Sequence, residues 1–272
     1  MIENHSIDKP ILYHSIYRNP EANSDWVVFI HGAGGSSTIW YKQINSFRKH
    51  YHLLLIDLRG HGRSKVNEEV NKRLDYTFDS IAQEIYYVLD VNTITKAHFV
   101  GVSMGTILIR QLVKIDKSRI ISMVMAGAIV SLTNFSRTLI VVGNSLKKVI
   151  PFLVLYTLFA YIILPKRSHK KSRSVFIHEA KKMKKTEFIR WFGLTRSLDK
   201  LLKVYQKTFH GLPILFISGK EDHLFIEDVK KMANLEPKGK IQIIENCGHI
   251  VNIEKAEIFN DITLEYLAQI NN

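Results

Sequence analysis

The sequence predicts an α/β fold in which helices cover both faces of a mostly parallel sheet. Short apolar runs recur along the 272 residues and are bounded by glycine or polar residues, which is typical of buried parallel strands. Between these runs, apolar residues recur at intervals of three and four, which indicates helices packed against the sheet. The alternation stops at about residue 130 and resumes near Leu212, so we expect an insertion within one large domain.

The expected elements follow in chain order. The first is an antiparallel strand or hairpin over residues 11–17 that opens the sheet. The apolar runs that predict the other strands are residues 26–30, 53–58, 98–102, 120–126, 214–218 and 241–244. Helical spacing is found at residues 41–50, 78–89 and 106–115.

The most informative motif is Gly-Val-Ser-Met-Gly at residues 101–105, a G-x-S-x-G sequence between a strand-like and a helix-like run. A sharp strand-to-helix turn can lift a serine hydroxyl clear of the backbone and toward a base. Such a turn crowds its neighbours, so the positions two before and two after the serine must be small. Gly101 and Gly105 meet that demand, which makes Ser103 the candidate nucleophile.

An activated serine needs a base, and the base needs an orienting acid. Asp222 lies in the loop after the strand expected at residues 214–218 and is the first choice for the acid, with Glu221 as the neighbouring alternative. His249 follows the last expected strand and is the candidate base. His31 and His61 lie in glycine-containing loops, where we expect them to shape the loop.

Acyl transfer also needs donors for an oxyanion. The sequence His-Gly-Ala-Gly-Gly at residues 31–35 follows an expected strand, and its glycines let the backbone aim N–H groups at a ligand. The backbone N–H groups of Ala33 and Met104 are the expected donors, because Met104 begins the helix that follows the nucleophile. A phosphate-binding loop is disfavoured, since no Gly-Lys-Ser/Thr sequence follows.

These segments together resemble the α/β-hydrolase superfamily, in its esterase, lipase and carbon–carbon-bond hydrolase branch. The resemblance rests on residues 31–35, 57–64 (Asp-Leu-Arg-Gly-His-Gly-Arg-Ser), 101–105, 219–222 and 248–249. The order serine, acid, histidine along the chain is also that of the family. Serine at position 103 argues against the haloalkane dehalogenase and epoxide hydrolase branches, which use aspartate there.

The resemblance implies an eight-stranded, mostly parallel sheet with a helical cap inserted after strand six. Residues 1–130 and 209–272 would then form the core and residues 131–208 the cap. The implied mechanism is an acyl-enzyme formed by a Ser-His-Asp triad, which requires neither a metal nor a cofactor.

The insert has an unusual charge and hydropathy. Residues 131–210 hold 17 Lys/Arg and 3 Asp/Glu, a net charge of +14, whereas the rest of the chain has a net charge of −1. Residues 149–164 form an uncharged stretch of sixteen, followed by a basic run at 166–173 and a lysine-rich helical pattern at 175–192.

Three structures would fit the uncharged stretch. A transmembrane helix is disfavoured, because sixteen residues are short and Pro151 lies near the start. A lid helix over the catalytic cleft is favoured. The third is an interfacial element whose apolar face meets lipid while the basic run meets anionic headgroups. The basic run alone would ordinarily form a solvated loop, and the sequence has no nucleic-acid-binding motif.

The leading functional hypothesis is a serine hydrolase that acts on an ester or thioester with an apolar part. Two alternatives stay open: a lactonase or carbon–carbon-bond hydrolase with the same triad, and a signalling or ligand-receptor homologue with slow turnover. The first ten residues contain no apolar stretch typical of a secretory signal, and the one cysteine excludes an intramolecular disulfide. We therefore expect a cytoplasmic protein, with membrane association open, and the sequence indicates no oligomeric state.

Overall fold

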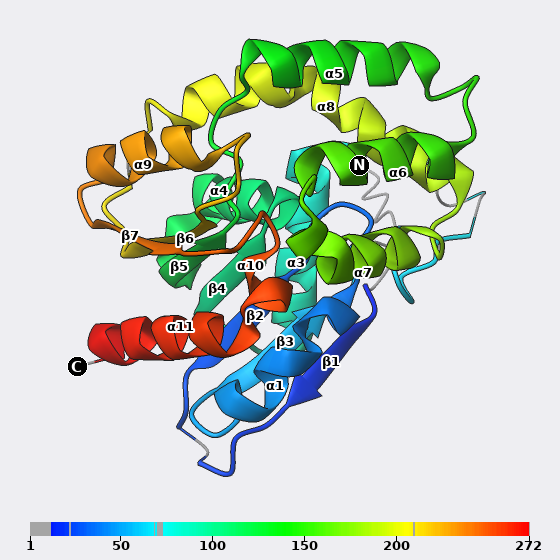
Figure 1. Ribbon diagram of the computed structural model, residues 1–272. Helices are drawn as coiled ribbons and strands as arrows, with labels where there is room; N and C mark the ends of the chain where they lie inside the picture. Colours follow the sequence, from blue (N-terminus) through cyan, green and yellow to red (C-terminus); the bar gives the residue numbers. More distant parts are fainter. Residues whose placement is uncertain (1–11, 22, 68, 70–72, 209, 272) are drawn as a thin grey trace.

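One sheet organises the structure (Figure 1), a computed structural model that describes residues 12–21, 23–67, 69, 73–208 and 210–271. Its strands follow the order β1-β3-β2-β4-β5-β6-β7. β1 (His14–Tyr17) is antiparallel to β3, and all other neighbouring pairs are parallel. The mostly parallel sheet is thus confirmed. The described residues supply seven strands rather than eight, because only β1 precedes the first parallel strand.

The parallel strands are largely apolar because both faces of the sheet are covered, except at the edge strand β7 (Gly239–Ile244), where Lys240, Gln242 and Ile243 are exposed. In β2, Val28 and Ile30 point into one apolar cluster, whereas Val27 and Phe29 point into the other. The parallel strands are β2 (Trp26–Ile30), β3 (His52–Ile56), β4 (Ala97–Val102), β5 (Ile120–Ala126), β6 (Ile214–Gly219) and β7 (Gly239–Ile244).

The covering helices form two layers. One face of the sheet carries α3 (Phe78–Val91), α4 (Met104–Asp116) and α9 (Ile226–Leu235). The other carries α1 (Tyr41–Phe47), α10 (Val251–Glu254) and α11 (Ala256–Asn271). The start of α3 shows how local sequence sets an element boundary: the Thr77 hydroxyl accepts from the Ser80 N–H, and the Ser80 hydroxyl accepts from the Thr77 N–H.

The interval between β5 and β6 is helical, as expected. It contains α5 (Asn134–Leu146), α6 (Phe152–Ile163), the 3-10 turn η3 (Arg167–His169), α7 (Lys170–Ala180) and α8 (Lys185–Tyr205). These helices lie together on one side of the molecule, with α5 along the edge farthest from α1 and α11 (Figure 1). They meet the loops that follow the parallel strands: the Trp191 indole donates to the Arg59 carbonyl at 2.9 Å.

The structure corrects two expectations for the insert. The helical pattern at residues 175–192 is not continuous, because the chain turns at residues 181–184. Met183 in this turn is buried with Phe188 of α8, so the turn lets α7 and α8 both pack against α6. The basic run forms η3 and the start of α7 rather than a loop: His169 is fully buried and Arg173 is 9% exposed, whereas Lys166, Arg167, Lys170 and Lys171 stay exposed.

The uncharged stretch forms α6, which has only 12 residues. Of the helices in the described part of the chain, none has the length and hydropathy needed to cross a bilayer.

Candidate active site

Ser103 lies on the sharp turn between β4 and α4, with φ 54° and ψ −120°. Non-glycine residues rarely adopt this region, so the turn is strained. A side-chain carbon at Gly105 would overlap the Ile30 carbonyl, and one at Gly101 would lie 2.6 Å from Cδ1 of Ile109. The turn therefore requires glycine on both sides of the serine, for the crowding reason that the sequence suggested.

The structure brings the serine, the histidine and one of the two candidate acids together. His249 Nε2 lies 3.0 Å from Ser103 Oγ, and His249 Nδ1 lies 2.8 Å from Asp222 Oδ2. Asp222 and His249 are buried. When Nδ1–H donates to the carboxylate, Nε2 is left to accept the serine proton. The geometry is that of a base poised between a nucleophile and an acid.

Glu221 points elsewhere. Its Oε1 lies 2.7 Å from Lys166 Nζ, and its Oε2 lies 2.8 Å from His169 Nε2. Hydrogen bonds from Lys166 first and His169 second lower the pKa of Glu221. The sequence left these two neighbouring carboxylates as alternatives, and their directions in the fold favour Asp222 as the partner of His249.

The electrostatics of His249 suit a charge that forms during a reaction. Burial is the largest single influence on its pKa and opposes protonation. The Asp222 charge and its hydrogen bond act in the other direction, with a smaller contribution from Glu254. The net result is that the pKa of His249 is raised above its ordinary value, so a positively charged ring is favoured at this position.

Two backbone amides lie beside the serine without protein partners. In the part of the chain that the structure describes, neither the Ala33 nor the Met104 N–H donates to another protein group. Gly32 approaches so closely that an added side-chain carbon would lie 3.1 Å from Ser103 Cβ. Both amides are therefore free to donate to a ligand next to Ser103.

His31 and His61 hold loops, as expected. His31 Nδ1 donates to the Gly32 carbonyl at 2.7 Å, and its Nε2 accepts from the Leu58 N–H at 3.0 Å. His61 Nε2 accepts from the Gly34 N–H at 2.9 Å. Burial lowers the pKa of both rings, which keeps them neutral and able to accept.

A cavity of about 210 Å³ opens beside Ser103 between the sheet and the insert. Among the described residues that line it, none carries a charge. The insert supplies most of the large side chains that line it, namely Leu132, Leu139, Ile140, Tyr156, Phe159, Ile162, Ile163, Phe176, Met183, Phe188, Trp191, Phe192 and Leu198. The cavity can therefore take an apolar, uncharged group.

A much smaller pocket of about 20 Å³ lies on the His249 side of Ser103. Glu179 of α7 lines it and accepts a hydrogen bond from Ser36 Oγ at 2.7 Å. Since a cavity of about 10–15 Å³ holds one water molecule, this pocket has room for one or two small atoms next to the histidine.

Sequence reasoning missed two residues of the insert at this site. The Tyr156 hydroxyl donates to the Ala33 carbonyl at 2.9 Å, on the loop that carries a free amide. Glu179 reaches Ser36 across 143 positions of sequence. No motif signals either residue, because their positions depend on how the insert folds over the strand ends.

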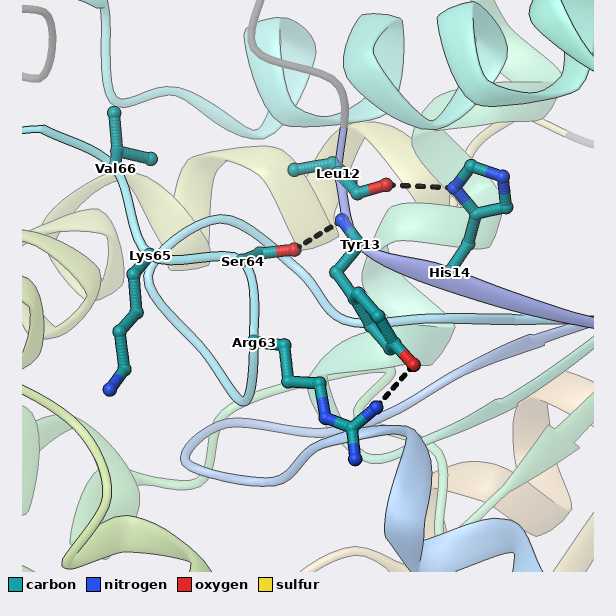
Figure 2. Close-up of a pocket in the computed structure, with 7 residues that line it drawn as sticks. All are labelled: Leu12, Tyr13, His14, Arg63, Ser64, Lys65 and Val66. Atoms are coloured by element: carbon teal, nitrogen blue, oxygen red, sulfur yellow. Dashed lines mark hydrogen bonds between the residues drawn. The ribbon is translucent and has the colours of Figure 1, made fainter.

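A third hollow, of about 330 Å³, lies beside β1 (Figure 2), and Ser103 is not among the residues that line it. It is lined by Leu12, Tyr13, His14, Arg63, Ser64, Lys65 and Val66. Ser64 is not an activated nucleophile, because its hydroxyl donates to the Asp57 carbonyl at 2.6 Å and accepts from the Tyr13 N–H at 2.7 Å. This hollow therefore does not compete with the site at Ser103.

Among the residues that the structure places, no group of three or more His, Cys, Asp or Glu side chains could hold a metal ion.

Comparison with known proteins agrees with the fold. A family described as alpha/beta hydrolase fold matches residues 25–150. A putative carbamate hydrolase, RutD, from Acinetobacter baylyi is 21% identical over 269 residues, which cover 93% of this chain and 97% of the relative. The 3-oxoadipate enol-lactonase 1 of the same organism is 32% identical over 91 residues, or 34% of this chain and 32% of the relative.

The fold also matches solved structures. A hydrolase from Oleispira antarctica superposes with a TM-score of 0.80 at 16% identity, covering 97% of each chain. The sheet order, the turn at Ser103 and these matches define one class of protein. The chain has the α/β-hydrolase fold, and its residues 25–150 match the family of that description.

Proposed function

We propose that this protein is a serine hydrolase that cleaves a carboxylic ester or thioester with an apolar acyl group. His249 takes the Ser103 proton, and Ser103 Oγ attacks the carbonyl carbon. The Ala33 and Met104 N–H groups stabilise the oxyanion, and Asp222 stabilises the charged His249 ring. His249 then gives the proton to the leaving group, and an activated water releases the acyl group. Residues 131–208 act as a cap over a core of residues 1–130 and 209–272.

The observation that carries this proposal is the uncharged cavity of about 210 Å³ beside Ser103. An apolar cavity of about 150 Å³ holds benzene, so this one has room for about eight carbon atoms. No charged side chain among the described lining residues could pair with a carboxylate on that group. Substrates with an uncharged acyl chain are therefore favoured over those with an acidic one.

The two cavities support an assignment of the two ends of the substrate. The leaving-group oxygen or sulfur must receive a proton from His249, so it lies on the side of the small pocket that His249 lines. The acyl chain then occupies the large cavity, which Met104 lines. A pocket of about 20 Å³ suits a water molecule once the leaving group has departed.

The test is a series of nitrophenyl esters of increasing acyl length, with a fluorophosphonate label for Ser103. We expect kcat/KM to rise with chain length up to about eight carbons and then to fall. Ser103→Ala should abolish labelling and lower kcat/KM by about 10⁴ or more. Full activity of that variant, or an optimum at acetate, would contradict the proposal.

A lactone is the second candidate, because it is an internal ester and one relative is named an enol-lactonase. The cavity favours an uncharged lactone with an apolar chain. A kcat/KM on such a lactone that equals or exceeds that on the best linear ester would favour this candidate. Turnover of a carbon–carbon-bond substrate, with poor turnover of both the lactone and the linear ester, would instead favour a carbon–carbon-bond hydrolase. Strong labelling with slow turnover of every substrate would instead indicate a ligand-receptor role.

A further inference from the structure

The outer face of α6 exposes a stripe of apolar residues to solvent. Val154, Leu158 and Tyr161 are 58%, 55% and 53% exposed. Their spacing of four and three positions puts them on one face of the helix. Val149, just before α6, is 81% exposed and extends this surface. We call Val154, Leu158 and Tyr161 the α6 stripe. Large exposed side chains in a row mark an interaction site more often than a neutral surface.

Cations lie at both ends of the α6 stripe. Lys148 precedes the helix, whereas Arg167, Lys170 and Lys171 follow it, and all four are exposed. In the described chain, none of the four has a carboxylate within ion-pair distance. The helix is 12 residues long, or about 18 Å, and the four cations lie four to eight positions from its ends along the chain. Arg173 stacks over the Tyr161 ring at 4.2 Å, which fixes α7 against the end of the stripe.

We propose that the outer face of α6 docks on the surface of an anionic lipid bilayer. An apolar stripe flanked by cations suits the boundary between acyl chains and headgroups, where apolar side chains enter and Lys/Arg meet phosphate. The net charge of +14 over residues 131–210 opposes pairing with a second copy of the same surface. Nucleic acid would satisfy the cations but would leave the apolar stripe without a partner.

The two sides of α6 link this surface to the cavity beside Ser103. Tyr156, Phe159 and Ile163 of the same helix line that cavity. Docking therefore places one wall of the cavity at the lipid boundary. The inference is independent of the proposed hydrolase activity, because it depends only on the outer face of the insert.

The experiment is vesicle co-sedimentation of the full chain and of its Ser103→Ala variant. Phosphatidylcholine vesicles are compared with vesicles that also contain phosphatidylglycerol, at low and high salt. We expect both proteins to bind only the vesicles that contain phosphatidylglycerol, and we expect this binding to weaken as the salt concentration rises. Lys170→Gln with Lys171→Gln should lower the partition coefficient about 30-fold. Lys114→Gln with Lys117→Gln, which are exposed near the amino end of β5, should leave it unchanged.

A second pair of variants tests the apolar part. Val154→Ser with Leu158→Ser should lower vesicle binding about tenfold or more. The matched control is Leu235→Ser with Ile258→Ser, which are 59% and 46% exposed on α9 and α11 and should not change binding. Circular dichroism checks that each variant is folded.

Several results would overturn the proposal. One is binding that does not depend on salt or on phosphatidylglycerol. Another is equal loss of binding in the test and control variants. Tight binding to duplex DNA that Val154→Ser with Leu158→Ser does not weaken would indicate a nucleic-acid surface instead. Self-association would be indicated if the wild-type protein sedimented as a dimer and did not bind vesicles, and if Val154→Ser with Leu158→Ser sedimented as a monomer.

Discussion

His249 contacts the Ser103 hydroxyl through one ring nitrogen and the Asp222 carboxylate through the other, at 3.0 and 2.8 Å. Its role in the proposed reaction depends on which protons it holds. A base must start neutral, and the buried Asp222 charge favours the protonated ring. At the scale of single residues, the pH dependence of the reaction should therefore report on this pair.

We expect kcat/KM to fall at acid pH, with an apparent pKa above the ordinary histidine value of about 6.5. The sign follows from the raised pKa of His249: protonation inactivates the base, and it occurs at a higher pH than in an unperturbed ring. Asp222→Asn removes the influence that raises this pKa, so the acid limb should move to lower pH. It should also lower kcat by about 10⁴. An acid limb that stays in place in that variant would contradict the pairing.

The neighbouring carboxylate provides a matched control. Glu221→Gln keeps the size of the side chain and removes the charge next to Lys166 and His169. Since Glu221 does not contact His249, we expect kcat to stay within about tenfold of wild type, against the far larger loss for Asp222→Asn. Steady-state kinetics of the two variants side by side would check this. A larger loss of kcat for Glu221→Gln than for Asp222→Asn would show that Glu221, and not Asp222, is the orienting acid.

At the scale of elements, two glycines of the insert helices have different surroundings: Gly143 is tightly packed, whereas Gly193 is not. In α5, an added carbon at Gly143 would lie 2.5 Å from Phe192 Cζ and 2.9 Å from Phe159 Cζ. In α8, an added carbon at Gly193 would have only Lys147 Nζ nearby, at 3.5 Å. Both phenylalanines line the cavity beside Ser103, so the first glycine sets the space available there.

Alanine at these two positions should affect the acyl-chain-length optimum differently. Gly143→Ala should push the phenylalanine rings into the cavity and shift the optimum of the ester series to shorter acyl chains. Gly193→Ala should leave that optimum unchanged and stabilise the protein by about 0.5–1 kcal/mol, because alanine favours an open helical position. Chain-length profiles and denaturant unfolding distinguish the two. An unchanged profile in Gly143→Ala would show that the acyl chain does not occupy this cavity.

At the scale of the whole molecule, the insert and the sheet share one apolar cluster. Trp191, Leu194 and Leu198 of α8 are buried with residues of α3, α4 and α9. Specific polar contacts add to this packing, such as the hydrogen bond from Trp191 to the Arg59 carbonyl. The insert is therefore bound to the rest of the chain by burial, and its helices should not unfold separately.

Thermal unfolding should show a single transition, with coincident curves from far-ultraviolet circular dichroism and tryptophan fluorescence. Trp191→Phe keeps the apolar ring but leaves the Arg59 carbonyl without its donor, which costs about 1–3 kcal/mol. The melting temperature should then fall by about 2–8 °C. Two separate transitions in the wild-type protein would show that the insert is an independent unit.

The sequence alone determined the features that depend on local pattern. Apolar runs bounded by glycine predicted the parallel strands to within a few residues, because a strand covered on both faces must be apolar throughout. The glycines around Ser103 predicted the strained turn, because that geometry leaves no room for a side chain. Motif order selected Ser103 and His249, which the fold brings to 3.0 Å although they are 146 positions apart.

Tertiary structure decided everything that depends on which way a side chain points. Asp222 and Glu221 are adjacent and chemically alike, and only the path of their loop turns one toward His249 and the other toward Lys166. The insert has no motif, so its turn at residues 181–184 and its cavity come from how three helices bury their apolar sides together. Local sequence motifs therefore predict the reactive residues of the site, whereas the cavity that selects a substrate arises only from long-range packing.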